Sequence, residues 1–74
     1  MVPSVTGDLK RSLTIAGHRT SLSLEPEFWM VLKDFAARER KSLAGLVGEI
    51  DETRGARNLS SAIRVWILQR LQAK

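Results

Sequence analysis

The sequence contains no cysteine and no tyrosine, and it has a single histidine, His18. Without cysteine the chain can form no disulfide, and it has no Cys/His cluster to hold a structural zinc ion. His18 has no metal-ligand partner at suitable spacing and no nucleophile beside it, so it is predicted to be neither a ligand nor a catalytic residue. The sequence also lacks a phosphate-binding glycine loop and a carboxylate cluster. We therefore expect no enzymatic activity, no metal and no cofactor.

Long hydrophobic runs are missing as well. No apolar stretch approaches the ~20 residues needed to span a bilayer, and the N-terminus lacks the apolar segment of a signal peptide. These two absences predict a cytoplasmic protein without a membrane partner.

The chain has 74 residues, of which 43% are hydrophobic, and a chain of this length forms at most one domain. The hydrophobic core of so short a chain contributes little net stability, and no disulfide or metal can add to it here. Burial against a second copy would supply the missing stability, so we expect a homodimer. The net charge of +4 and the pI near 10.4 favour an anionic partner such as nucleic acid.

The N-terminal third of the chain divides into an arm and two alternating runs. Residues 1–8 combine Pro, Gly and small polar residues without a period, which predicts a flexible arm ahead of a domain at 9–74. Residues 9–15 and 19–25 alternate apolar and polar side chains, as half-buried strands do. Gly17 lies between them and predicts a turn. The runs can form a hairpin, which we favour, or the first can add to the edge of a ribbon.

Three helical hydrophobic periods follow, at 26–39, 43–53 and 59–71. Pro26 is favourable in the first turn of a helix, and Ser42 and Asn58 are good N-caps for the second and third helices. Gly55 predicts the end of the second helix. The third helix has apolar residues on more than one side, which predicts contacts with its own chain and with a neighbour.

A strand followed by two helices, with the runs KRSLTIAGHRTS at 10–21, LEPEFW at 24–29 and NLSSAIRV at 58–65, resembles the ribbon-helix-helix proteins. These are dimeric DNA binders that include the Arc and MetJ repressors, and the runs are most similar to a bacterial subfamily of small stand-alone proteins. In this family, strands from two chains pair antiparallel and the ribbon enters the major groove. The resemblance covers residues 10–70 and implies a mainly α fold with a short β ribbon. It further implies an intertwined homodimer, to which this chain adds an N-terminal hairpin or extra strand and a third C-terminal helix.

The resemblance also implies which residues bind DNA. The groove-facing side of the strand carries Arg19, Ser21 and Ser23, and Arg19 is the stronger candidate for specificity through bidentate contact with guanine. The first turn of the second helix would contact a phosphate, as exposed helix N–H groups do. The candidates for contact with the DNA backbone are Lys10, Arg11, Lys41 and Ser42.

For the dimer core, the resemblance implies six apolar residues: Leu22, Leu24, Leu46, Val47, Ile50 and Trp66. Gly45 and Gly48 lie on one side of the second helix, and they predict close approach of another backbone across the dimer axis.

Together these features predict a dimeric, sequence-specific DNA-binding protein of bacterial type, a transcriptional repressor that binds double-stranded DNA. An antitoxin-type regulator is a close variant of this prediction. A protein-interaction or oligomerisation module with the same fold is the alternative, because serine side chains are short and the net charge is modest. A protein partner is left open.

Overall fold

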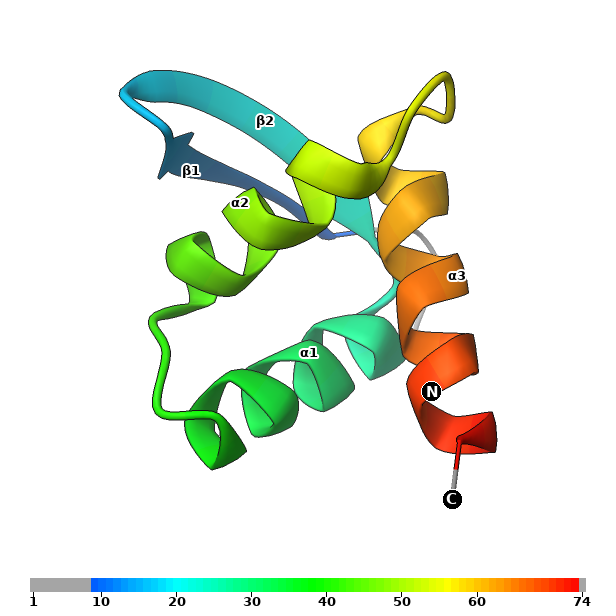
Figure 1. Cartoon of the computed structure of the whole chain (residues 1–74). Coiled ribbons are helices and arrows are strands. Elements are labelled where there is room, and N and C mark those ends of the chain that lie inside the picture. The colour runs from blue at the N-terminus through cyan, green and yellow to red at the C-terminus, as the bar shows by residue number, and fades with distance from the viewer. Residues whose placement is uncertain (1–8, 74) are drawn as a thin grey trace, which may run out of the picture.

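A computed structural model describes residues 9–73 of the chain, and the predicted arm at 1–8 lies outside the described residues. A two-stranded antiparallel sheet is followed by three helices (Figure 1). The elements are β1 (Leu9–Ile15), β2 (His18–Leu24), α1 (Pro26–Arg38), α2 (Leu43–Thr53) and α3 (Leu59–Gln72).

The two strands form a hairpin, the arrangement that the sequence favoured. Their register runs without a bulge from Leu9 opposite Leu24 to Ile15 opposite His18. The two turn residues, Ala16 and Gly17, have φ angles of 52° and 84°. Two consecutive left-handed residues match a tight turn to the right-handed twist of the strands, which explains the glycine.

The predicted helix starts are confirmed. Pro26 is the first residue of α1. The Ser42 hydroxyl accepts a hydrogen bond from the Gly45 N–H at 2.9 Å, and the Asn58 side chain accepts one from the Ser61 N–H at 2.8 Å. Each cap satisfies a backbone donor that the helix itself leaves without a partner.

Helix α1 ends in a left-handed residue that is not glycine. Arg40 has a φ of 58°, and its N–H donates to the Ala37 carbonyl at 3.1 Å. The next N–H, of Lys41, donates to the Ala36 carbonyl at 2.9 Å. This pair of bonds is the Schellman motif, which usually takes glycine at the position that Arg40 occupies.

The helices pack against one face of the hairpin: α2 against β1, and α1 and α3 against β2. Between them lies a core of twelve buried residues: Ile15, Leu22, Leu24, Trp29, Leu32, Ala36, Leu46, Val47, Ile50, Ala62, Ile63 and Ile67. Five of the six residues expected in a dimer core are therefore already buried within one chain. The sixth, Trp66, is half-buried and meets the Phe35 ring edge-on at 5.3 Å. The role of these six residues in a dimer core stays a prediction.

The small residues of α2 have neighbours within the chain. A Cβ added at Gly48 would lie 3.3 Å from the Cγ2 of Ile15, and one at Gly45 would lie 2.9 Å from the Ser42 hydroxyl. The absence of a side chain at Gly48 thus lets the hairpin pack closely on α2. The predicted approach of a partner backbone at these glycines stays a prediction.

Candidate nucleic-acid interface

The outer face of the hairpin is the face turned away from the helices. Successive side chains of a strand point to opposite faces, and Ile15, Leu22 and Leu24 are buried on the inner face. Residues of the other parity therefore project outward, and paired residues share a face. The outer face consists of Lys10, Ser12 and Thr14 on β1 and Arg19, Ser21 and Ser23 on β2. Ser23 is half-buried, and the other five side chains are exposed.

Two cations, four hydroxyl groups and no carboxylate make up this outer face. Within residues 9–73, neither Lys10 nor Arg19 takes part in an ion pair. Lys10 is paired with Ser23 at the open end of the hairpin, and Arg19 is paired with Thr14 near the turn. Four residue steps separate these pairs, which places the cations roughly 13 Å apart along the ribbon.

Such a surface can form hydrogen bonds to nucleic acid in two ways. A guanidinium donates two parallel hydrogen bonds to guanine, and a serine or threonine hydroxyl bonds to several base edges. An ammonium group such as that of Lys10 attracts phosphate oxygens. The outer face thus brings together the three predicted base-contacting residues and one predicted backbone-contacting residue.

Arg11, the neighbour of Lys10, lies on the inner face instead. It is paired with the buried Leu22, and its guanidinium lies 5.3 Å from the centroid of the Trp29 ring. A cation over an aromatic face is a stabilising contact within the fold. Arg11 is nevertheless exposed, and its contact with the DNA backbone stays a prediction.

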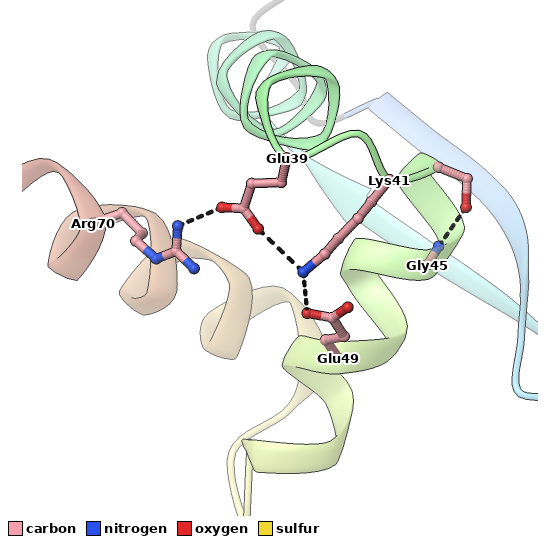
Figure 2. Close-up of polar contacts among 6 residues, drawn as sticks. Glu39, Lys41, Gly45, Glu49 and Arg70 are labelled. Carbon is pink, nitrogen blue, oxygen red and sulfur yellow. Dashed lines mark hydrogen bonds and ion pairs between the residues drawn. The ribbon is translucent and has the colours of Figure 1, made fainter.

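The other two predicted backbone-contacting residues, Lys41 and Ser42, lie immediately before α2. Ser42 is exposed and caps the helix through its hydroxyl. The Lys41 ammonium donates to the Glu49 carboxylate at 2.6 Å and to the Glu39 carboxylate at 3.2 Å. Glu39 also accepts a hydrogen bond from Arg70, so an alternating chain of charges joins α3, the end of α1 and α2 (Figure 2). We call these four residues, Arg70, Glu39, Lys41 and Glu49, the helix junction.

The contacts of the helix junction shift the pKa values of Glu39 and Lys41. Hydrogen bonds from Arg70 and then Lys41 lower the pKa of the Glu39 carboxyl. Hydrogen bonds to Glu49 and then Glu39 raise the pKa of the Lys41 ammonium. Both shifts favour the charged forms, so at neutral pH the positive charge of Lys41 is balanced by neighbouring carboxylates.

Two features were not assigned a role from the sequence. Ser12 and Thr14 share the outer face with the predicted reading residues, and the alternation of 9–15 already pointed to them. On the surface of α3, a groove of about 390 Å³ is lined almost entirely by apolar atoms. Its residues are Phe28, Arg64, Val65, Ile67, Leu68 and Leu71.

None of the helices within residues 9–73 has the length and apolar character required to cross a membrane. The same part of the chain shows no group of three or more side chains placed to hold a metal ion.

One of three comparisons with known proteins gives a match. The model of a family described as "Ribbon-helix-helix domain" matches residues 9–71, which includes the hairpin and nearly all of α3. No curated protein and no solved structure gives a significant match. Ribbon-helix-helix domains are typically DNA-binding regulators rather than enzymes, and they generally dimerise. The chain belongs to the ribbon-helix-helix domain family.

Proposed function

We propose that this protein is a homodimeric, sequence-specific DNA-binding protein, a transcriptional repressor that inserts an antiparallel β ribbon into the major groove. The outer face of the hairpin carries this proposal, because it presents cations and hydroxyl groups without a carboxylate. Membership of the ribbon-helix-helix family supports it.

The contacts follow from the positions of the side chains. Arg19, Ser21 and Ser23 face the base edges, and Arg19 contributes most of the discrimination through bidentate bonding to guanine. Lys10 and the first turn of α2 at Ser42 contact the phosphate backbone.

Arg11 and Lys41 are further backbone contacts only if they exchange their present partners. Lys41 would leave two carboxylates, and Arg11 would leave the Trp29 ring. Each exchange has a cost that Lys10 does not incur, so we assign Lys10 the larger share of phosphate binding.

The test is a titration of random-sequence and selected duplexes at several salt concentrations. If a dimer neutralises about four to six phosphates, log affinity should fall with log salt at a slope of roughly −4 to −5. The selected site should be preferred by at least ~10³-fold. A reporter gene carrying that site should be repressed when the protein is produced. Equal, weak binding to every duplex would contradict the proposal.

We place the contact between the two copies at the apolar groove on α3. Leu68 and Leu71 are 54% and 55% exposed, although both are large apolar side chains in a well-formed helix. Phe28 and Val65 continue the same apolar surface. A second α3 in this groove would remove these side chains from water, and the family's general tendency to dimerise supports that occupant.

The dimer is tested by sedimentation at micromolar concentration and by the dependence of the melting temperature on concentration, which should rise. Leu68→Glu should give a folded monomer. Met30→Glu is the matched control, because Met30 is 72% exposed but does not line the groove. A stable folded monomer in the unmodified protein would overturn the dimer.

The alternative function is a protein-interaction module, and the same groove favours it, since a partner protein could occupy the surface around Leu68. Such a module would bind DNA weakly and without a preferred site. The duplex titration separates the two functions.

A further inference from the structure

We propose that α3 positions the DNA-reading strand, through Ser60 and Arg64, which hold the end of β2 where the chain enters α1. Each of the two acts through a residue at that end of the strand, so both are positioning residues rather than DNA contacts. This inference rests on the proposed function and deepens it, because it adds residues of α3 to those on which the preference for one DNA sequence depends.

The first contact is a hydrogen bond from α3 to the backbone of β2. The Ser60 hydroxyl donates to the Ser23 carbonyl at 2.8 Å, across 37 positions of the sequence. Ser60 lies in the first turn of α3, which Asn58 caps by accepting a hydrogen bond from the Ser61 N–H at 2.8 Å. The donor therefore stands on a capped helix, and it fixes the strand at a residue of the outer face. The Ser23 carbonyl oxygen has a second lone pair, so a strand of a second copy can bond to it as well.

The second contact lies one helical turn further along α3. Arg64 follows Ser60 by four residues, so the two side chains lie on the same side of the helix. The Arg64 guanidinium donates to one oxygen of the Glu25 carboxylate at 3.0 Å and to the other at 3.5 Å, and it lies 5.8 Å from the centroid of the Phe28 ring. Glu25 occupies the N-cap position of α1, but its side chain forms no cap hydrogen bond. The carboxylate thus joins the start of α1 to α3.

These contacts supply direction more than stability. The side chains of Arg64 and Glu25 are 34% and 40% exposed, and an ion pair of this exposure contributes little to the free energy of unfolding. Leu22 and Leu24, on the inner face of the same strand, are buried in the core. Burial of apolar surface is non-directional, whereas a hydrogen bond depends on distance and angle. The leucines therefore hold the strand against the helices, and α3 fixes the angle of its outer face.

That angle bears on the contacts proposed for the outer face. Only Glu25 separates β2 from α1, so a shift at this point tilts the side chains of the strand (Figure 1). Hydrogen bonds from Arg19 and Ser21 to base edges require a close match of distance and direction. Attraction to phosphates is electrostatic and independent of sequence, and it tolerates such a tilt. Loss of Ser60 or Arg64 should therefore weaken binding to the selected duplex more than binding to random-sequence duplexes.

The test measures the ratio of the affinities for selected and random-sequence duplexes, from which a change in overall charge largely cancels. Ser60→Ala should lower this ratio at least about fivefold, the change expected on losing one hydrogen bond of ordinary strength. Ser60→Thr keeps a hydroxyl and should restore most of the ratio. Ser61→Ala is the matched control, because Ser61 takes part in the helix cap through its backbone N–H, and it should leave the ratio unchanged.

Arg64 is tested by reversal of charge. Arg64→Glu places a second carboxylate beside Glu25 and should lower the ratio, whereas Glu25→Arg combined with Arg64→Glu restores a pair of opposite charges and should recover it. Ala37→Glu, on the exposed side of α1, is the control for added negative charge, and it should weaken binding to both kinds of duplex by the same factor. All titrations are made at a temperature at which thermal melts show each variant to be folded.

The outcomes distinguish the inference from the proposed function. If Ser60→Ala and Arg64→Glu weaken binding to both kinds of duplex by the same factor, or leave both affinities unchanged, α3 does not position the reading strand and the inference is wrong. The proposed function then stands, because the unmodified protein keeps its preferred duplex. If the unmodified protein prefers no duplex, the proposed function fails and the inference fails with it.

Discussion

The outer face of the hairpin and the helix junction both carry basic residues, but those residues differ in their surroundings. Lys10 and Arg19 extend from the hairpin with no ion pair inside the described range, whereas Lys41 and Arg70 are bound to carboxylates. A cation without an ion-pair partner, such as Lys10, can exchange its counterions for phosphates directly. A cation bound to carboxylates, such as Lys41, stabilises the packing of helices, and it must give up a partner before it can bind DNA. A count of positive charges in the sequence cannot separate these two roles.

The largest effect that we predict is the loss of DNA affinity on Arg19→Ala, which removes a cation from the outer face of the hairpin. Loss of a bidentate contact should weaken binding to the selected site by roughly 1–3 kcal/mol and relax the preference at one base pair. The melting temperature should hardly change, because Arg19 is exposed. Titration of duplexes mutated at each position measures the preference. An unchanged preference would move the specificity to residues 10–14 of β1.

The second prediction compares the left-handed residues of the two regions. Gly17→Ala should destabilise the fold by roughly 1 kcal/mol, because an L side chain is strained at a φ of 84°. Arg40→Gly, at the end of α1, should stabilise the fold by about 0.5–1 kcal/mol, because glycine adopts a φ of 58° without strain. Denaturant unfolding measures both changes. A stabilising effect of Gly17→Ala would mean that the hairpin turn differs from the one described.

The third prediction concerns the carboxylates that bind Lys41. Glu49→Gln removes the closer partner, and Lys41 should then stay with Glu39. Affinity for random duplexes should rise by no more than about twofold, which reflects the added net charge alone. Glu52→Gln on the same helix is the matched control, and it should give the same small increase. A much larger increase with Glu49→Gln would show that Lys41, once released, binds phosphate.

The smallest expected effect is the pH dependence of the helix junction. The pKa of Glu39 is lowered below 4.5 in the fold, so its stabilising contribution is present above that pH and is lost as pH falls through the lowered value. The pKa of Lys41 is raised above 10.5, so its contribution is lost only as pH rises through the raised value. Glu39→Gln should lower the melting temperature at neutral pH, and the difference should disappear in acid. A difference that persists at low pH would contradict this origin.

The local features of the fold could be predicted from the sequence because they depend on neighbouring residues. The alternation around Leu22 and Leu24 predicted β2, and Ser42, Gly55 and Asn58 predicted where helices begin and end. The end of α1 was harder to place, because Arg40 occupies a position that usually holds glycine.

The features that could not be predicted depend on residues distant in the chain. Lys41 meets a carboxylate eight residues away, and Glu39 meets Arg70, 31 residues away. No helical spacing indicates either contact. In the same way, α2 packs against both β1 and α3, which are distant from it in the sequence, and residues such as Leu46 are buried within the chain. The base-contacting and backbone-contacting roles stay predictions.

The most direct test of the central claim, that the hairpin cations rather than the paired cations of the helix junction meet DNA, is the salt dependence of binding in two variants. Lys10→Ala should make the slope of log affinity against log salt shallower by about one for each chain bound. Lys41→Ala should leave that slope nearly unchanged, although it should lower the melting temperature. If Lys41→Ala flattens the slope and Lys10→Ala does not, the account has assigned the DNA contact to the wrong region.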